Sequence, residues 1–273
     1  MTAQLVKRYL DKYFIGQELI KQELSILLQA MVNGYNFSIL FRGGSGSGKT
    51  YLSEVCVNYL LIKAHEDFSY YLMDTDNFRL TDKRIHILDE VHKFKDQELI
   101  YPYLDSGKYT VFICTNEYDE LKDPLIRRCI NFTFESYSIE ELMQMAQKYF
   151  MKRRVELKTS YLEIIVSSSR FSPASVLMLS KRLFYIFKQE GIPTNELKLL
   201  ELISKYFKIE EGLSEVDREY LSFLKRNGMA GLNTLSVILG IPKKIITDEI
   251  EPFLIKRNLI RITPRGRILY EST

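Results

Sequence analysis

Apolar and polar residues alternate along the chain in two rhythms, and the order of these rhythms predicts the architecture. Residues 3–34 carry apolar side chains at helical spacing, and short apolar runs then alternate with further helical segments. We expect the apolar runs to be buried strands, at residues 37–42, 69–73, 85–89, 110–115 and 130–134. Strands that alternate with helices are typical of an α/β fold, so we predict a mostly parallel five-stranded sheet.

The pattern changes after this α/β part. Residues 138–207 have helical spacing throughout, and the polar residues 208–212 suit a hinge. The last part combines helical segments with a basic hairpin. We therefore predict an α/β core at 1–136, a helical lid at 137–208 and a small C-terminal domain at 213–273.

The composition is that of an ordinary globular protein. Its 273 residues are 46% hydrophobic and 27% charged, and a net charge of +3 is too small to indicate a nucleic-acid partner by itself. No run approaches the ~20 apolar residues of a membrane span, and the N-terminus lacks the apolar segment of a signal peptide. We expect a cytoplasmic protein that does not contact a membrane. Cys56, Cys114 and Cys129 fit buried thiols better than a disulfide or a metal site.

Residues 43–50, GGSGSGKT, follow the first apolar run and match the phosphate-loop pattern G-x-x-x-x-G-K-[ST]. Glycine at this density weakens both helix and strand, so the backbone itself must be bent and exposed here. In such a loop Lys49 reaches the β- and γ-phosphates, and the Thr50 hydroxyl ligates Mg²⁺. The less specific alternative is a glycine turn between a strand and a helix. We predict an ATP and Mg²⁺ site formed by Gly44, Ser45, Gly46, Ser47, Gly48, Lys49, Thr50 and Tyr51.

An acidic pair, Asp89 and Glu90, ends the apolar run at 85–89 about forty residues after the loop. The carboxyl end of a parallel strand faces the ligand crevice of an open α/β sheet. We expect Asp89 to hold Mg²⁺ through its water shell and Glu90 to polarise the attacking water. An acidic pair at a strand end is common, and only the preceding phosphate loop favours the catalytic interpretation. His86, in the same run, fits packing better than chemistry.

Two further polar positions follow the next strands. Asn116 comes directly after residues 110–115, where an amide can orient the lytic water; the alternative is a turn-forming asparagine. Arg127 and Arg128 precede the last strand, and arginine stabilises the charge of phosphoryl transfer, often from a neighbouring molecule. Their alternative is a pair of solvated charges at the end of a loop.

Taken together, these motifs resemble the AAA+ ATPases, on residues 43–50, 88–90, 115–116 and 124–128. The segment FIGQ resembles the entry segment of that family, in which Phe14 and Ile15 would line the adenine pocket. The C-terminal part resembles the winged helix of the RuvB family of Holliday-junction branch-migration motors, on residues 231–235, 250–255 and 263–267. The resemblance covers nearly the whole chain in the same domain order.

This resemblance implies an AAA+ P-loop core, a helical lid and a C-terminal winged-helix domain that binds DNA. It makes Arg128 the arginine finger, which acts on the ATP of a neighbouring subunit. The catalytic set would then be Glu90, Asn116 and Arg128, in a homo-oligomer that the family suggests is a hexameric ring, formed with nucleotide or DNA.

The chain departs from the RuvB pattern at two places. The family has a sensor arginine after a Gly-Thr-Pro in the lid, but here the matching residue is Ala174, which cannot contact a γ-phosphate. Arg170 or Arg182 could replace it. The family also has an extra β-hairpin between the Asp-Glu strand and the next strand, and this hairpin docks the RuvA partner. Residues 91–109 leave no room for it beside a short helix, so we expect no RuvA-type partner.

Basic residues in the last part predict the DNA contact. Between residues 253 and 269 there are five of them and no acidic residue: Lys256, Arg257, Arg261, Arg265 and Arg267. Gly266 between two arginines suits a hairpin tip that approaches a phosphate, and we assign DNA binding to Arg261, Arg265 and Arg267. The alternative is a solvated run of charge.

The function predicted from the sequence is that of an ATP-hydrolysing, ring-forming, RuvB-like protein acting on DNA. Two alternatives stay open at this point. One is a loader-type switch, such as a helicase loader, in which ATP governs assembly on DNA. The other is a DNA-binding adaptor whose nucleotide site is structural, which Glu90 and Arg128 disfavour and Ala174 favours.

Overall fold

The computed structural model describes residues 2–65, 67–73, 79 and 81–270. The chain forms two compact units. Unit 1 consists of residues 1–144 and 172–174, and unit 2 consists of residues 145–171 and 175–273. None of the helices in the described part of the chain is long and apolar enough to cross a membrane.

Unit 1 is built on a parallel five-stranded sheet in the order β2-β3-β4-β1-β5. Its strands are β1 (Ser38–Arg42), β2 (Phe68–Leu72), β3 (Ile85–Asp89), β4 (Thr110–Thr115) and β5 (Ile130–Thr133). The five predicted strands and the α/β fold are confirmed, because every strand lies within one residue of its predicted range. In this order β1, β4 and β3 are adjacent, so the loops after these three strands meet at one edge of the sheet.

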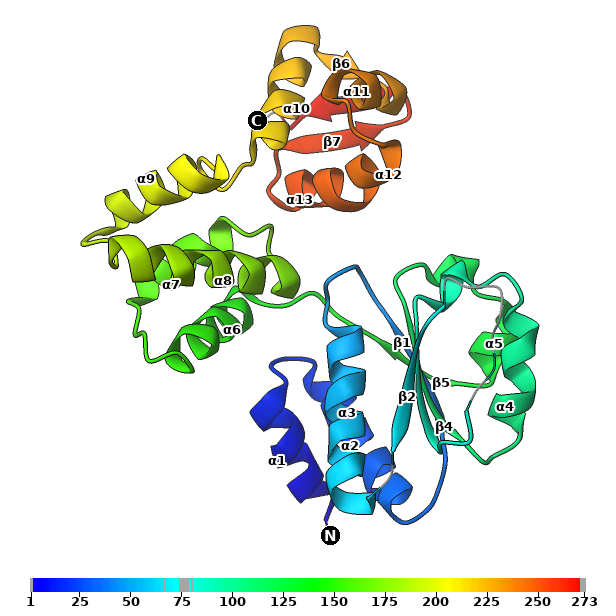
Figure 1. The fold of residues 1–273 in the computed structure, drawn as a ribbon. Helices are drawn as coiled ribbons and strands as arrows, with labels where there is room; N and C mark the ends of the chain where they lie inside the picture. Colours follow the sequence, from blue (N-terminus) through cyan, green and yellow to red (C-terminus); the bar gives the residue numbers. More distant parts are fainter. Residues whose placement is uncertain (1, 66, 74–78, 80, 271–273) are drawn as a thin grey trace. The chain divides into compact units, whose positions relative to one another are not determined.

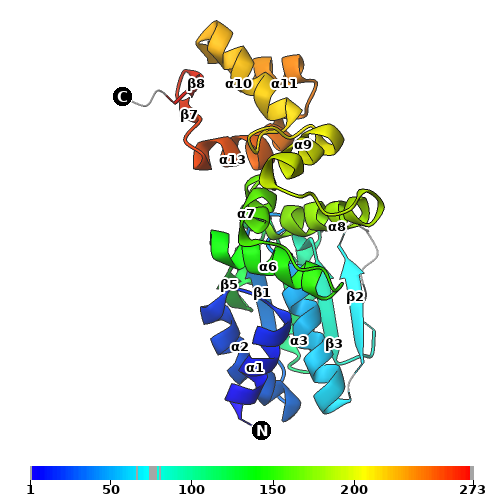
Figure 2. The same ribbon diagram turned by 90° about the vertical axis from the view of Figure 1, so that its left-hand side faces the viewer.

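Helices cover both faces of this sheet. The first set is α1 (Ala3–Tyr13), α2 (Glu18–Val32) and α3 (Lys49–Ala64); the second is α4 (Tyr101–Asp105) and α5 (Asp123–Arg127). In Figure 1, α1, α2 and α3 lie on one side of the sheet and α4 and α5 on the other, and Figure 2 shows the first set in front of the strands. Short 3₁₀ turns connect them at η1 (Val91–Lys93), η2 (Gln97–Ile100) and η3 (Tyr118–Glu120).

The central strands of unit 1 read as apolar runs because both of their faces are covered. Every residue of β3 and β4 is buried, including His86, whose ring lies between those of Tyr71 and Tyr109. A parallel sheet covered on both faces has this uniform burial rather than an alternating pattern. His86 therefore belongs to the packing of the sheet, as the sequence predicted.

Unit 2 begins within helix α6 (Ile139–Met151), which starts in unit 1. Three further helices follow, α7 (Thr159–Ser167), α8 (Pro173–Glu190) and α9 (Glu196–Phe207). Unit 2 also contains the C-terminal part, with α10 (Glu215–Asn227), β6 (Met229–Ala230), α11 (Leu232–Leu239), α12 (Lys243–Ile245), η4 (Ile246–Ile250), α13 (Glu251–Lys256), β7 (Ile260–Thr263) and β8 (Gly266–Leu269). The lid and the C-terminal part thus share one compact unit, and their division into separate domains stays a prediction.

The last two strands form the predicted basic hairpin. They pair antiparallel, and β6 completes a small sheet in the order β6-β8-β7. The hairpin turn is Pro264 and Arg265, so Gly266 is the first residue of β8 rather than the tip. Gly266 has φ of 148°, and a Cβ on it would lie 2.7 Å from the carbonyl oxygen of Ala230. A side chain is therefore excluded at this position by the neighbouring strand.

Candidate functional site

The phosphate loop connects β1 to α3 and has the backbone that its glycines allow. Gly43, Gly46 and Gly48 have φ of 154°, 70° and 96°, values that residues other than glycine rarely adopt. A Cβ on Gly48 would also lie 3.3 Å from the ring of Phe14. The chain needs glycine at these positions for the bend, and the alternative of an ordinary turn does not explain three such residues in six.

Lys49 is the first residue of α3 and lies over the loop that precedes it. Its ammonium donates hydrogen bonds of 2.8 Å to the carbonyl oxygens of Gly43 and Gly44, and the side chain is 6% exposed. Burial lowers the pKa of Lys49, and the carboxylates of Asp89 and Glu90 partly offset this. The ammonium group therefore lies beside the loop backbone. An anionic phosphate bound there would replace the water contacts that burial has removed from it.

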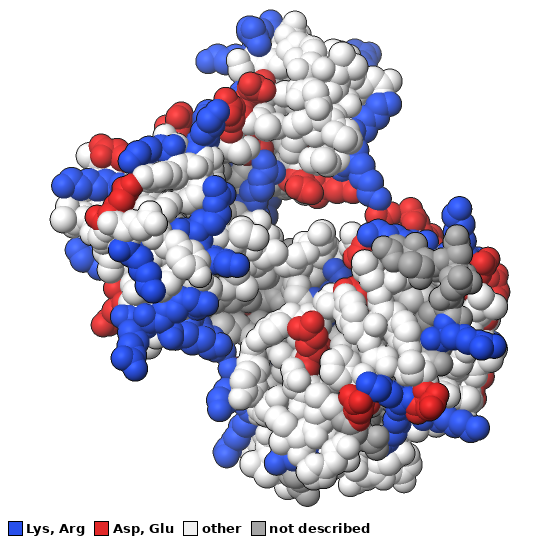
Figure 3. Space-filling model, viewed as in Figure 1, with Lys and Arg blue, Asp and Glu red and all other residues white. Residues whose placement is uncertain are grey.

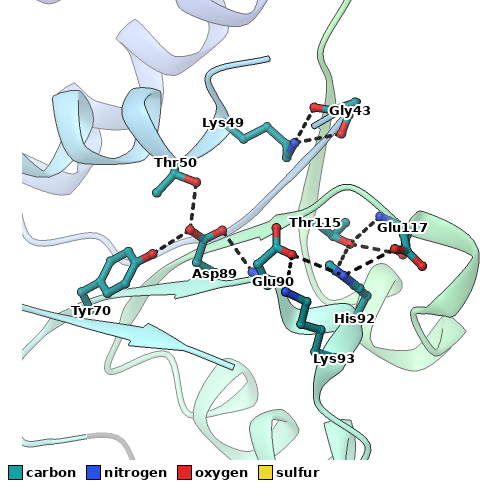
Figure 4. A network of polar contacts seen from close by, with 11 residues as sticks. Gly43, Lys49, Thr50, Tyr70, Asp89, Glu90, His92, Lys93, Thr115 and Glu117 are labelled. Atoms are coloured by element: carbon teal, nitrogen blue, oxygen red, sulfur yellow. Dashed lines mark hydrogen bonds and ion pairs between the residues drawn. The ribbon is translucent and has the colours of Figure 1, made fainter. Parts of the chain in front are cut away.

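Asp89 is the point at which three segments of unit 1 converge (Figure 4). Its Oδ2 accepts hydrogen bonds from the Thr50 hydroxyl at 2.9 Å and from the Tyr70 hydroxyl at 2.7 Å. Its Oδ1 accepts one from the backbone N–H of Glu90 at 3.0 Å. The carboxylate is thereby fixed in one orientation, with its oxygens beside the Thr50 hydroxyl.

These two oxygen groups fit a magnesium ion. The hydroxyl of Thr50 and the carboxylate of Asp89 are hard oxygen ligands, and Mg²⁺ is usually held by one or two such groups together with substrate phosphates. In the described part of the chain no group of three or more His, Cys, Asp and Glu residues could hold a metal by itself. A site completed by nucleotide phosphates is consistent with both findings.

Glu90 follows Asp89 in a left-handed conformation, with φ of 57°, and its side chain leaves the strand toward η1. Its Oε2 lies 3.0 Å from the ammonium of Lys93 and 3.5 Å from Nε2 of His92 (Figure 4). To act as a general base Glu90 must exchange the half-exposed Lys93 for water.

His92 links Glu90 to the end of β4. Its Nδ1 is 3.2 Å from the hydroxyl of Thr115, and its Nε2 is 3.8 Å from a carboxylate oxygen of Glu117. The side chain is only 3% exposed, so its orientation is set by these neighbours. Asn116 lies between Thr115 and Glu117 at the same edge of the sheet, and its buried Oδ1 accepts no hydrogen bond within the described residues. An acceptor of this kind is free to accept a hydrogen bond from a water molecule or a ligand.

A group of aromatic side chains packs beside the phosphate loop, next to Gly48. Phe14, which is 4% exposed, stacks on Tyr51 with 6.0 Å between the ring centroids. The Tyr51 hydroxyl donates to the carbonyl oxygen of Tyr13 at 3.1 Å, and Tyr137 donates to that of Ser47 at 2.8 Å. Ile15 is half-buried beside Phe14. The sequence predicts an adenine ring at this apolar corner of unit 1, and that role stays a prediction.

Ala174 lies against the phosphate loop, at the start of α8. Its backbone N–H donates to the carbonyl oxygen of Gly46 at 3.3 Å, and a Cβ on Gly46 would lie 2.8 Å from that of Ala174. The residue matched to the family's sensor arginine is therefore close to the loop but carries no charge. The two arginines considered as replacements have partners inside unit 2: Arg170 pairs with Asp217 at 2.7 Å, and Arg182 stacks on Phe207.

Arg128 directly follows α5, and its side chain is one-third exposed. Its Nε lies 2.9 Å from a carboxylate oxygen of Asp105, and its guanidinium lies over the ring of Tyr101. Both partners belong to α4, so the arginine is held on the surface of unit 1. A role on the nucleotide of another subunit stays a prediction.

The three predicted DNA-binding arginines differ in what they contact. Arg267 forms two hydrogen bonds of 2.8 and 3.1 Å to the carboxylate of Glu251, which is 2% exposed and also accepts one from Tyr220 at 3.0 Å. The carboxylate raises the pKa of Arg267 further. Arg261 lies over the ring of Tyr270, whereas Arg265 is exposed at the hairpin turn. The contacts of Arg267 favour a structural role over the predicted DNA contact.

Four residues join the site that the sequence did not indicate: Tyr70, His92, Glu117 and Tyr137. Each is a common residue type next to a strand end or within an edge strand. No spacing rule links them to the phosphate loop, and only the strand order brings them there.

Known proteins similar to this chain include RuvB proteins. The Holliday junction branch migration complex subunit RuvB of Mycoplasma genitalium is 27% identical, with 96% of this chain and 94% of that protein covered. The protein of the same name from Thermotoga maritima is 28% identical, with 95% and 88% covered. A solved structure of the Thermotoga maritima RuvB Holliday junction branch migration motor has a TM-score of 0.78 at 25% identity, covering 94% of this chain and 93% of that one.

Two family models match parts of the chain. The first is described as the RuvB C-terminal winged helix domain and matches residues 210–273. The second is described as Microtubule binding and matches residues 7–93, which include the phosphate loop and Asp89. Similarity to RuvB extends over nearly the whole chain and so includes both matched segments. The predicted resemblance is confirmed: the chain is a RuvB-like AAA+ protein with a C-terminal winged helix.

Proposed function

We propose that this RuvB-like chain is an ATPase that couples ATP hydrolysis to work on DNA, as a DNA motor or remodelling enzyme. The observation that carries the proposal is the convergence of Thr50, Asp89 and Glu90 beside Lys49 at one edge of the sheet. Together with an arginine from a neighbouring subunit, these are the groups that phosphoryl transfer to water uses. The alternative of an adaptor with a structural nucleotide site does not explain why a general base is retained.

Each group has a separate task in the proposed reaction. The loop backbone and Lys49 hold the β- and γ-phosphates, and Phe14, Ile15 and Tyr51 hold the base. A bound Mg²⁺ would neutralise developing phosphate charge, and Thr50 and Asp89 would be its protein ligands. Glu90 accepts a proton from the attacking water, which the free Oδ1 of Asn116 orients.

We propose that the active form is a homo-oligomeric ring in which Arg128 contacts the nucleotide of the adjacent subunit. A hexamer is the state suggested by the resemblance to RuvB. The surface position of Arg128 on unit 1 supports an action on a neighbouring molecule. Because the ATP and DNA that this function needs are cytoplasmic, we place it there.

We also propose that the chain works without a RuvA-type partner. Residues 91–109, all of which the structure describes, contain η1, η2 and α4 and no strand. Helical turns therefore occupy most of residues 91–105, and only residues 106–109 remain before β4, too few for two paired strands. Calorimetry with a RuvA protein of the same source tests this, and specific micromolar binding that depends on residues 105–109 would contradict it.

Glu90→Gln is the variant that tests the ATPase assignment. It removes the base but keeps the phosphate cradle, so ATP binding should persist while turnover falls by roughly a hundredfold or more. Lys49→Ala should lose ATP binding as well. Hydrolysis by Glu90→Gln at the wild-type rate would show that the assigned base is wrong.

A further inference from the structure

A cluster of cations lies in unit 2 at the end of α6 and along α8. We call it the lid patch and define it by five residues: Lys152, Arg153, Arg154, Lys181 and Lys188. All five are exposed, and Figure 3 shows Lys and Arg gathered where α6 ends. None of them belongs to the predicted ATP site or to the winged helix.

Aromatic rings join the two halves of the lid patch. The guanidinium of Arg153 lies 3.6 Å from the centroid of Tyr149 and 5.6 Å from that of Phe184. The ammonium of Lys188 lies 4.9 Å from the same Phe184 centroid. The turn after α6 and the face of α8 therefore present their cations side by side. Cation–π contact orients these long side chains without neutralising them.

On α8 the patch continues as a stripe. Lys181, Tyr185 and Lys188 are spaced i, i+4 and i+7, which places them on one face of a helix over a rise of about 10 Å. Tyr185 is 57% exposed between the two lysines. An exposed ring flanked by cations offers both apolar contact and charge to a ligand.

The lid patch has no acidic counterpart within the described residues. Some other cations of unit 2 do pair with carboxylates: Arg170 with Asp217, Arg267 with Glu251, Lys205 with Glu190 and Lys208 with Glu215. No described carboxylate lies within salt-bridge distance of the five patch residues. Helix α8 contains no acidic residue before Glu190. A positive surface that its own fold leaves uncompensated is suited to an external polyanion.

We propose that the lid patch binds the phosphate backbone of duplex DNA, as a contact surface separate from the winged helix. This inference rests on the proposed function only in taking DNA as the substrate. A phosphate backbone carries one charge about every 1.7 Å of duplex axis, so a 10 Å row of cations meets several phosphates at any register. An acidic protein surface offers discrete carboxylates that would have to match each lysine. The contact carries no base-specific information, and its binding is independent of sequence.

The test is the salt dependence of binding to a short labelled DNA duplex by the full-length protein. In the double variant Lys181→Gln/Lys188→Gln, loss of two phosphate contacts should lower the log–log salt slope by about two and weaken the affinity roughly tenfold at low salt. Lys181→Arg/Lys188→Arg should bind like the wild type. Lys198→Gln/Lys205→Gln on α9 removes the same charge from exposed positions outside the patch and should change the slope little.

The outcomes separate this inference from its alternatives. An unchanged slope and affinity in Lys181→Gln/Lys188→Gln would overturn it. Loss of self-association with unchanged DNA affinity would also overturn it, because the patch would then be an interface between copies of the chain. A wild type that binds duplex DNA through the patch but hydrolyses no ATP would contradict the proposed function and leave this inference standing.

Discussion

The two units of the chain have net charges of opposite sign, and this difference matches the ligands that we propose for them, ATP for unit 1 and DNA for unit 2. Unit 1 contains 16 basic and 21 acidic residues, a net charge of −5. Unit 2 contains 22 basic and 14 acidic residues, a net charge of +8. The total of +3 hides this asymmetry, which is why net charge alone gave no indication of a DNA partner.

Charged side chains of unit 1, the acidic unit, take part in a compact polar network. Unit 2, the basic unit, has exposed cations without an acidic partner among the described residues. In unit 1 the carboxylate of Asp89 accepts hydrogen bonds from the hydroxyls of Thr50 and Tyr70 and from the backbone N–H of Glu90, at one edge of the sheet. In unit 2 the lid patch has no acidic partner within the described residues, as shown above. A site for a small, highly charged ligand needs fixed geometry, whereas a contact with a long polyanion needs only surplus charge.

The largest effect is expected for Arg128, which we propose completes the ATP site of a neighbouring subunit. Arg128→Ala should lower ATP turnover by about a thousandfold if the arginine acts on the transition state of a neighbour's ATP. Arg127→Ala, one residue earlier and exposed, is the matched control and should leave the rate close to that of the wild type.

Mixing subunits tests the trans arrangement in the same experiment. Rings of Arg128→Ala and Lys49→Ala subunits should recover part of the activity, because some interfaces then combine an intact finger with an intact loop. Full activity in a proven monomer, independent of protein concentration, is the result that contradicts this prediction.

A stability measurement sharpens the contrast within unit 2. Arg267→Ala leaves the carboxylate of Glu251 buried without its cation, which should lower the free energy of unfolding by about 3 kcal/mol. Arg265→Ala, at the exposed hairpin turn, should change stability by less than about 0.5 kcal/mol and weaken DNA binding instead. Denaturant unfolding of both variants measures the difference. Equal stability of the two would show that Arg267 is not a structural residue.

A pH titration probes the core of unit 1. Burial lowers the pKa of His86, so below about pH 6.5 the unfolded chain takes up a proton that the folded chain does not. The unfolded state then binds more protons than the folded state. The free energy of unfolding therefore decreases as the pH is lowered, by up to about 2 kcal/mol between pH 7 and pH 5. His86→Phe, which keeps the ring contacts with Tyr71 and Tyr109, should remove this part of the acid sensitivity. An identical pH profile in the variant would assign the loss to other groups.

The smallest expected effect concerns the orientation of Asp89. Tyr70→Phe removes one hydrogen bond to Oδ2 and should raise the Mg²⁺ concentration needed for nucleotide binding by about tenfold. Tyr71→Phe is the matched control, because Tyr71 is the next residue of β2 and its hydroxyl accepts a hydrogen bond from the backbone N–H of Thr81. Nucleotide binding titrated against Mg²⁺ measures both, and equal midpoints would leave Tyr70 without a role at the site.

The sequence predicted the sheet well because its signal is local. Buried strands such as 85–89 and 110–115 are uniform apolar runs, and GGSGSGKT combines a steric requirement with a chemical one in eight adjacent residues. The positions of Asp89, Glu90 and Asn116 followed from the rule that parallel strands end at one edge. In the buried strands and the phosphate loop, the residues that form the sequence pattern are the same residues that the fold requires.

The remaining contacts depend on pairings that spacing does not encode. Arg267 and Arg265 are two residues apart in one basic run, yet one pairs with a buried carboxylate and the other is exposed. Tyr70 reaches Asp89 only because β2 lies beside β3. The lid patch joins the end of α6 to α8, about thirty residues later, through a ring that the pattern identifies only as core. Such contacts come from tertiary packing.

The central claim is that ATP turnover in unit 1 depends on DNA held by unit 2, and the steady-state ATPase rate with and without DNA tests it most directly. We expect Mg²⁺-dependent hydrolysis that duplex DNA stimulates in the wild type. The stimulation should need higher DNA concentrations in Lys181→Gln/Lys188→Gln and be absent in Glu90→Gln. A wild type that binds ATP but hydrolyses none, with or without DNA, would contradict it.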